Sequence, residues 1–434
     1  MMILYNILTL TALFLIILGF PVILSLILFS EKRKKTFLQR MAFIPLPEKV
    51  YKKKKKKTGI WIHALSLGEV VSAIPLVKAV KHRFAQKEIF FSVSTKTGFE
   101  TAQRQLKNHV KDIFFFPYDL LFSVKKIIDQ VSPEFVIIIE TDIWPNFMAE
   151  TEKQNIPVFL VNTRLSPRSF SGYKRFSFFI GPVLNKFSKI CTQSEADAKS
   201  FEKLIQKSDN IIITGNIKFD QPVEPVPDED IKKMRFFMNI DKDCKVIVAG
   251  STHEGEESVL AEVFLKLKIC FNNLCLIAVP RNPDRAGSVC GIFQSKGIKA
   301  LKMADIELKH EPFDVMVVDR IHVLKKLYAV ADISFTGGSL APFGGHNPLE
   351  PAVFAKPVIF GPYMSDFNEI SKLLLDSGGA VQVKDGDGLY TAFSEFLSSP
   401  EKAAKAGQQS FKVFNENKGA VKRTVDIIER YLSR

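Results

Sequence analysis

The sequence predicts an α/β protein with two doubly wound parallel sheets, preceded by a membrane-spanning helix. Short continuous apolar runs alternate with segments of helical periodicity, which is typical of strands buried on both faces of a parallel sheet. This alternation stops at 220–229, a segment with three prolines and several acids, and then restarts. Residues 2–30 carry no charge and are long enough to span a hydrocarbon core.

The first 58 residues predict an anchor and a basic linker. A charged, mostly basic run at 31–35 follows the apolar stretch, and positive flanking charge belongs on the cytoplasmic side. We therefore expect residues 1–30 to be an uncleaved transmembrane anchor, with the body in the cytoplasm; a buried globular helix is the alternative. The linker, 31–58, contains six consecutive lysines at 52–57. We expect them to form a solvated linker that, close to a membrane anchor, also attracts anionic lipid headgroups, at roughly 1 kcal/mol per residue.

Two similar halves follow the linker. We expect a first Rossmann-like domain at 59–220, a second at 221–400, and a C-terminal helical stretch at 401–434, one option for which is to pack back on the first domain. In the first half, strands are expected at 59–65, 89–93, 135–139, 158–161, 190–193 and 211–214, with helices at 70–84 and 99–110. In the second half, strands are expected at 245–249, 274–279, 314–318, 332–335 and 357–360.

The composition limits the class of partner. A net charge of +14 favours anionic partners such as nucleic acid, anionic lipid or a phosphorylated substrate. Nucleic acid fits least well, because no aromatic residues interleave with the lysine run. The five cysteines show no Cys-x-x-Cys spacing, so we expect reduced thiols in a cytosolic body.

The segment 336–352 predicts a ligand-binding loop. An apolar run leads into glycine pairs at 337–338 and 344–345, and Asn347 and Glu350 have the spacing of a helix N-cap and a capping box. Glycines let a backbone approach a ligand closely, and a helix N-terminus favours an anion. We therefore expect a phosphate to bind the backbone N–H groups of 337–339 and 344–345. A tight turn without a ligand is the plainer interpretation.

Other polar residues follow predicted strands. Glu69 opens a helix after the first strand, Glu140 and Asp142 follow a later one, and Arg281 and Arg285 follow a strand of the second half. Each has a plainer interpretation, as a first-turn acid, a surface acid pair or surface arginines. Ligands of open α/β sheets bind beyond the carboxyl ends of the strands, so the shared position favours a site. We expect the two sheets to face a cleft that takes a nucleotide-linked donor.

Six segments of the chain resemble the 3-deoxy-D-manno-octulosonic acid (Kdo) transferases of Gram-negative lipid A biosynthesis. In chain order they are HALSLGE, ETDIWPN, NTRLS, TGNIKFD, PRNPDR and GGHNPLEPA. The resemblance implies a GT-B glycosyltransferase that uses CMP-Kdo without a metal or other cofactor. It also implies the tetra-acylated disaccharide precursor of lipid A as the acceptor, at the cytoplasmic leaflet of the inner membrane.

The resemblance also assigns residues. Glu69 matches the proposed catalytic base, and Glu140 matches a second acid on the acceptor side. On the donor side, Arg281 matches an arginine near the nucleotide, and the CMP-binding loop is matched by Gly337, Gly338, Ser339, Asn347 and Glu350. Asn282 and Tyr363 stand where the family usually has histidine, and residues 319–323 also depart from its pattern, so donor contacts at these positions are open.

The expected mechanism is a single inverting displacement with Glu69 as general base. The helix N-terminus would lower the pKa of Glu69, and Gly68 would allow the sharp turn that aims its side chain. No carboxylate cluster in the sequence suggests a Mg²⁺ site, so we expect no metal. Two alternatives stay open: a membrane-tethered, non-catalytic protein that binds a nucleotide or polyanion, and another nucleotide-sugar enzyme such as an epimerase.

Overall fold

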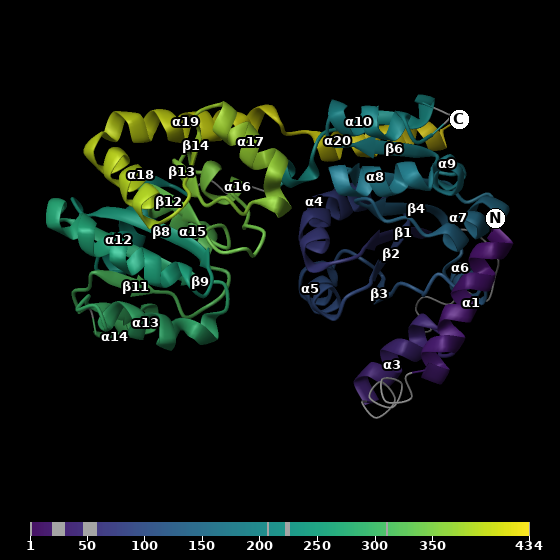
Figure 1. The fold of residues 1–434 in the computed structure, drawn as a ribbon, viewed down its shortest axis with the longest axis horizontal. Helices are drawn as coiled ribbons and strands as arrows, with labels where there is room; N and C mark the ends of the chain where they lie inside the picture. The colour runs from purple at the N-terminus through teal and green to yellow at the C-terminus, as the bar shows by residue number, and fades with distance from the viewer. Residues whose placement is uncertain are drawn as a thin grey trace. The chain divides into compact units, whose positions relative to one another are not determined.

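The computed structural model describes residues 2–19, 31–46, 59–205, 208–221, 226–309 and 311–433. The chain divides into two compact units, each with its own parallel sheet (Figure 1). Unit 1 comprises Met1–Pro222 together with Lys418–Arg434, and unit 2 comprises Val223–Asn417. The prediction of two doubly wound parallel sheets is confirmed, and the division lies within the predicted linker at 220–229.

Unit 1 contains a seven-stranded sheet of order β3-β2-β1-β4-β5-β6-β7. The strands are β1 (Gly59–Ala64), β2 (Glu88–Val93), β3 (Asp112–Phe115), β4 (Pro133–Ile139), β5 (Val158–Thr163), β6 (Lys189–Thr192) and β7 (Ile211–Ile213). The helices are α4 (Leu67–Arg83), α5 (Lys96–Leu106), α6 (Leu121–Val131), α7 (Pro145–Lys153), α8 (Pro167–Arg175), α9 (Ser177–Leu184) and α10 (Glu195–Glu202), with 3-10 turns at Ser208–Asn210 and Ile217–Asp220. The winding direction reverses between β1 and β4, which makes their carboxyl ends the topological switch point of this sheet.

Both faces of this sheet are buried. Along β1, Ile60 and Ile62 belong to one hydrophobic cluster, with α4, α5 and α20, whereas Trp61 belongs to the other, with α6 and α7. The Trp61 ring meets that of Phe147 edge-on, with centroids 5.2 Å apart. A strand buried on both faces needs apolar residues at every position, which explains the continuous apolar runs of the sequence.

The N-terminal segment folds onto unit 1. Helices α1 (Met2–Gly19) and α3 (Glu31–Arg40) precede β1 (Figure 1, purple). Tyr5 of α1 donates its hydroxyl to the Asp119 carboxylate at 2.9 Å. Ala42 and Leu46 are buried in the unit 1 core, so residues 31–46 of the predicted linker are structured, which corrects that prediction.

The structure does not support the predicted anchor. Among the residues it describes, no helix is long and apolar enough to cross a membrane. Residues 1 and 20–30 of the predicted anchor, and the lysine run at 52–57, lie outside the described residues.

Unit 2 contains a second seven-stranded sheet, of order β10-β11-β9-β8-β12-β13-β14. The strands are β8 (Lys245–Thr252), β9 (Leu274–Pro280), β10 (Ala300–Lys302), β11 (Val315–Val317), β12 (Ile333–Thr336), β13 (Val358–Phe360) and β14 (Ala380–Gln382). The helices are α11 (Asp228–Phe237), α12 (Glu256–Cys270), α13 (Ala286–Gln294), α14 (Met303–Lys309), α15 (Leu324–Val330), α16 (Leu349–Ala352), α17 (Asn368–Asp376), α18 (Gly386–Ser398) and α19 (Pro400–Glu416), with 3-10 turns at Pro283–Arg285 and Ser365–Phe367. Here the switch point lies between β8 and β12.

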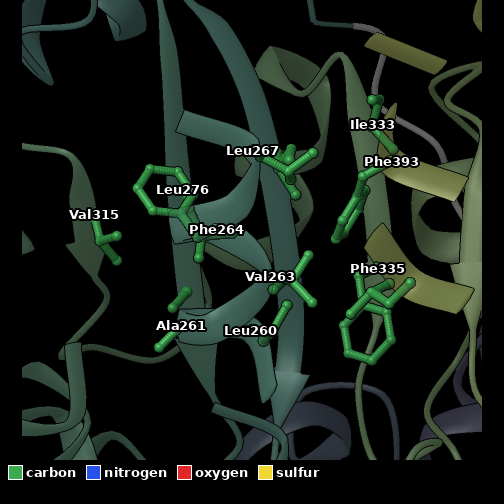
Figure 2. Packing of buried hydrophobic residues seen from close by; sticks show 14 of the residues in the cluster. Leu260, Ala261, Val263, Phe264, Leu267, Leu276, Val315, Ile333, Phe335 and Phe393 are labelled. Carbon is green, nitrogen blue, oxygen red and sulfur yellow. The ribbon is translucent and has the colours of Figure 1, made fainter. Parts of the chain in front are cut away.

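Helix α12 is anchored in the core of unit 2. Figure 2 shows its residues Phe264 and Leu267 among the side chains of one buried cluster, which also contains the strand residues Leu276 and Phe335. The first turn of α12 is therefore held in place by the packing of the rest of the helix.

The C-terminal stretch 401–434 is shared between the two units. Helix α19 belongs to unit 2, and only α20 (Ala420–Leu432) packs on unit 1. The Asp220 carboxylate accepts the N–H groups of Gly419 and Val421, both at 2.6 Å, and so caps α20. The predicted single stretch at 401–434 is therefore two helices in different units, which corrects that prediction. Packing back on the first unit holds for α20 alone.

Candidate functional site

Three carboxylates meet at the switch point of the unit 1 sheet. Glu69 lies in the first turn of α4, directly after β1, and Glu140 directly follows β4, which pairs with β1. Asp142 follows two residues later, and its Oδ2 lies 3.1 Å from Nε2 of His63 on β1. The negative charges of Glu140 and Asp142 both act on Glu69. The structure thus brings together the two predicted catalytic acids, Glu69 and Glu140.

The surroundings of Glu69 favour its protonated form. Its Oε2 accepts the N–H of Leu65 at 2.6 Å, and its Oε1 accepts the hydroxyl of Ser66 at 3.1 Å. Burial and the neighbouring charge of Glu140 outweigh these two bonds and raise the pKa of Glu69 to about 7. The expected lowering by the helix N-terminus is therefore wrong, because desolvation and like charge dominate at this position.

Gly68 is not required for the turn that aims Glu69. It lies inside α4, its φ is not left-handed, and a Cβ added there would have no heavy atom within 4 Å. The turn that was expected to depend on Gly68 therefore does not use the conformational freedom of glycine at this position.

Glu140 has a strained backbone. Its φ is +62°, a region that non-glycine residues rarely occupy, and Asn162, the last residue but one of the neighbouring strand β5, has a φ of +58°. Such a conformation costs of order 1–3 kcal/mol and persists only where the surrounding structure enforces it. The Glu140 N–H donates to the Val161 carbonyl at 2.8 Å, and its carboxylate lies 3.8 Å from Nζ of Lys218. Strain at two adjacent strand ends is typical of a functional edge.

His63 is a buried polar residue that the sequence interpretation did not assign to the site. Its side chain is fully buried, its Nδ1 lies 2.9 Å from Oγ of Ser92, and its ring stacks on Phe116 with centroids 4.0 Å apart. With its Nε2 on Asp142, the ring fixes that carboxylate beside Glu69. The sequence did hold a signal for this role, because His63 is a polar residue inside an otherwise apolar strand.

In unit 2 most of the predicted phosphate-binding amides are already engaged. Glu256, the first residue of α12, has a side chain that is only 1% exposed. Its Oε2 accepts the N–H groups of His253 at 2.9 Å and Gly338 at 2.7 Å, and its Oε1 accepts those of Ser339 and Leu340, both at 2.9 Å. A phosphate therefore cannot use these loop amides while Glu256 holds them, which corrects the predicted phosphate contact.

The two glycine pairs of the loop bind one another. Gly345 donates its N–H to the Gly338 carbonyl at 2.8 Å, and His346 donates to that of Gly337 at 3.1 Å. Gly338, Gly344 and Gly345 all have left-handed φ values, between 68° and 87°, so glycine is needed at each. Ser339 is fully buried, and its hydroxyl donates to the Thr336 carbonyl and accepts the Gly361 N–H at 2.8 Å.

The predicted capping box does not form. Helix α16 begins at Leu349 and has four residues, and the Asn347 side chain accepts the Leu349 N–H at 3.1 Å in a turn before it. The Glu350 carboxylate receives no hydrogen bond from the described part of the chain. Burial raises the pKa of Glu350, against the opposing charges of Lys325 and Arg281. The Glu350 carboxylate is half-buried beside the predicted ligand-binding loop. It can therefore accept hydrogen bonds from the hydroxyl groups of a ligand.

Arg281 and a histidine pair lie against the same loop. His253 and His346 stack 5.1 Å apart and share a hydrogen bond between their Nε2 atoms at 2.8 Å, so one ring donates and the other accepts. Burial, Arg281 and His253 lower the pKa of His346 to about 3, which keeps this ring neutral at pH 7.

The exposed guanidinium of Arg281 makes no ion pair or hydrogen bond with the described residues. Arg285, by contrast, forms a paired contact with the buried Glu257 at 2.8 and 3.2 Å.

The two positions that depart from the family pattern have different surroundings. Asn282 accepts the Asp284 N–H at 3.1 Å and so caps a 3-10 turn, whereas Tyr363 is 47% exposed. Within the described ranges, no group of three or more His, Cys, Asp or Glu residues could hold a metal ion.

Comparisons with known proteins identify relatives along most of the chain. Residues 35–221 match the sequence model of a family described as 3-deoxy-D-manno-octulosonic-acid transferase. The 3-deoxy-D-manno-octulosonic acid transferase of Haemophilus influenzae is 34% identical over 378 residues, which cover 87% of this chain and 88% of the relative. The enzyme of the same description from Rickettsia felis is 31% identical, over 86% of this chain and 79% of the relative.

Solved structures support the fold. A glycosyltransferase from Rickettsia africae has a TM-score of 0.57 and 14% identity, covering 87% of this chain and 99% of its own. UDP-GlcNAc 2-epimerase from Neisseria meningitidis, bound to UDP-GlcNAc, has a TM-score of 0.58 and 14% identity, covering 87% of this chain and 100% of its own. At this level of identity the likeness shows a GT-B-like fold and nothing about the reaction.

Proposed function

The chain belongs to the Kdo transferase family, and from this premise we propose that it transfers Kdo from CMP-Kdo to the tetra-acylated disaccharide precursor of lipid A. As a member of the family it is a glycosyltransferase that transfers Kdo in lipopolysaccharide synthesis. The observation that carries the finer proposal is Glu69, a carboxylate at a sheet switch point whose pKa is raised to about 7.

Glu69 is the general base of this proposal. An acceptor hydroxyl attacks the anomeric carbon of Kdo, its proton passes to the Glu69 carboxylate, and the bond from that carbon to the CMP phosphate oxygen breaks with its electron pair leaving on CMP. Attack from the face opposite CMP inverts the anomeric centre. A base works best when its pKa lies near the working pH, and a value of about 7 meets that condition. Glu140 either orients the acceptor or is the alternative base.

The donor side of the proposal uses unit 2. Arg281 presents a guanidinium without a protein partner among the described residues, which suits the phosphate of CMP. The Glu350 carboxylate accepts no hydrogen bond from the residues that the structure describes, which suits the ribose hydroxyls. Gly337, Gly338 and Ser339 form the close-packed floor of the loop, and Asn347 shapes the turn before α16. The negative charge that develops on CMP would be stabilised by Arg281.

A non-catalytic binding protein of the same fold would explain Glu69 less well. A carboxylate whose pKa is raised by burial lowers folding stability whenever it is ionised. In a protein that only binds its ligand, this loss of folding stability would have no function. A general base, by contrast, needs the raised pKa.

The decisive test is product analysis with Kdo-labelled CMP-Kdo and the lipid precursor. Label should move to the lipid with release of CMP, and Glu69→Gln should abolish most of this transfer. Label that appears only as free Kdo, or stays in CMP-Kdo, would contradict the proposed reaction.

As part of the same proposal we place the protein at the cytoplasmic face of the inner membrane, in contact with anionic lipids. The uncharged stretch 2–30 and the basic runs at 31–35 and 52–57 support this location. Removing residues 1–30 should release the protein from membranes in high salt. The truncation also removes the Tyr5–Asp119 hydrogen bond, so its melting temperature should be measured in parallel. A folded truncation that stays on the membrane would show that other surfaces hold it.

A further inference from the structure

Glu256 occupies the amide site of the loop at 337–340. A carboxylate has about four lone-pair positions, and four backbone N–H groups fill them, from His253, Gly338, Ser339 and Leu340. The side chain is 1% exposed, so no water competes for these bonds. This is the arrangement in which backbone amides bind an external anion, with a protein carboxylate in the anion's place.

The carboxylate cannot readily leave this site. Glu256 begins α12, and residues further along that helix, including Leu260 and Phe264, are buried in the unit 2 core (Figure 2). The loop is equally confined, because a Cβ on Gly337 would lie 2.5 Å from the Ser251 carbonyl oxygen and one on Gly338 would lie 3.0 Å from His346. Helix and loop are thus held together at the ends of β8 and β12, where the sheet changes winding direction.

We propose that Glu256 is a positioning residue for the donor: an internal anion that fixes the 337–340 loop and keeps the donor phosphate off its amides. The proposal rests on the function proposed above for the identity of the donor. It predicts that the phosphate is bound by side chains at the loop surface. Arg281 is the available arginine, since Arg285 is committed to Glu257.

The alternatives are distinguishable. If Glu256 only adds stability, its loss should affect donor binding no more than the loss of another buried acid of the same helix. If instead it competes with the donor phosphate for the amides, its loss should strengthen phosphate binding. Glu257 offers the matched control, because it is equally buried, is the next residue of α12, and binds Arg285 and Thr252 rather than the loop.

The experiment compares Glu256→Gln with Glu257→Gln in the full-length protein, using CMP as the probe. Titration calorimetry should show CMP affinity falling about tenfold or more in Glu256→Gln, since several charge-assisted hydrogen bonds to the loop are lost. In Glu257→Gln, affinity should stay within about twofold at a comparable loss of melting temperature. Hydrogen exchange should speed up at the amides of Gly338, Ser339 and Leu340 in Glu256→Gln alone.

Three outcomes overturn the proposal. One is an equal loss of CMP affinity in both variants, another is tighter CMP binding by Glu256→Gln, and the third is unchanged amide exchange in Glu256→Gln. If the wild-type protein does not bind CMP but amide exchange still differs between Glu256→Gln and Glu257→Gln, the proposed function is wrong. The donor role of Glu256 is then wrong as well. If Glu256→Gln does not fold, Glu256→Asp replaces it, because it keeps the charge but shortens the reach by one methylene, and the same ordering against Glu257→Gln is expected.

Discussion

Two glutamates stand at comparable places in the two units and meet opposite surroundings. Glu69 lies in the first turn of α4, after β1, and Glu256 begins α12, after β8. Each of these strands flanks the switch point of its own sheet. Glu69 accepts two hydrogen bonds and experiences the negative charges of Glu140 and Asp142, whereas Glu256 accepts four backbone N–H groups.

The comparison shows that a helix N-terminus does not by itself decide what a first-turn acid does. The number of donors aimed at the carboxylate and the charge of its neighbours decide it. Glu69 lacks enough donors to offset its burial, and it is left able to take up a proton near neutral pH. Glu256 has every lone pair engaged and acts as part of the framework. One unit thus presents a reactive acid, and the other uses an acid to build a rigid loop.

The largest expected effect is on turnover. Glu69→Gln should lower kcat by about 10²–10⁴-fold, because the attacking hydroxyl loses its base, while donor binding and melting temperature change little. The control is Glu195→Gln, another first-turn glutamate whose side chain is 72% exposed and paired with Lys199. Steady-state rates with CMP-Kdo and the lipid precursor check this. Near wild-type turnover in Glu69→Gln would remove that residue from the mechanism.

A donor-side variant should act on binding. Glu350→Ala should weaken CMP-Kdo affinity by about tenfold, since one charge-assisted hydrogen-bonding group to the ribose is lost. Because the Glu350 carboxylate has no hydrogen-bond partner in the described parts of the chain, its removal should leave the melting temperature nearly unchanged. A folded variant with wild-type donor affinity would exclude the assignment.

Two glycines should respond differently to the same change. Gly337→Ala should destabilise the protein by about 1–3 kcal/mol, because the new Cβ would lie 2.5 Å from a backbone oxygen that cannot move freely. Gly68→Ala should instead stabilise it by roughly 0.5–1 kcal/mol, since the site is open and helical. Denaturant unfolding of both variants measures the difference. Equal stabilities would show that the unit 2 loop is less confined than its geometry indicates.

Acid should weaken unit 2 through His346. Its pKa is about 3 in the folded protein against 6.5 for an ordinary histidine, so between these values the unfolded chain binds more protons. Stability should therefore fall as pH decreases from about 6.5 towards 3, by at most roughly 1.4 kcal/mol per pH unit for this one group. Thermal unfolding of His346→Gln across pH 4–7 should give a shallower slope than wild type. A slope as steep as that of the wild type would assign the acid sensitivity to other groups.

Metal removal should have the smallest effect. The leaving group has a single phosphate, and the sequence shows no carboxylate cluster of the kind that holds Mg²⁺ against a diphosphate. Activity should survive EDTA. Loss of activity that a divalent ion restores would contradict this expectation.

The sequence predicted the sheets well because strands buried on both faces must be apolar throughout. It missed β3, β10 and β14, which have three or four residues each and too short a pattern to stand out. The positions of Glu69 and Glu140 after strands placed them at the site. The bond from Glu256 to Gly338 joins residues 82 positions apart, and no local pattern encodes it. The pKa of Glu69 was missed for the same reason, because it depends on burial in the folded chain and on a second carboxylate after a different strand.

We infer that burial, together with the like charge of Glu140, makes Glu69 a base near neutral pH. The measurement that tests it most directly is the pH dependence of kcat/KM for wild type and Glu140→Gln. Wild type should lose activity on the acid side with an apparent pKa of about 7. In Glu140→Gln this limb should move to lower pH, because one like charge is gone, while turnover at pH 8 largely survives. A limb that does not move, or a Glu140→Gln variant as inactive as Glu69→Gln, would contradict the account and favour Glu140 as the base.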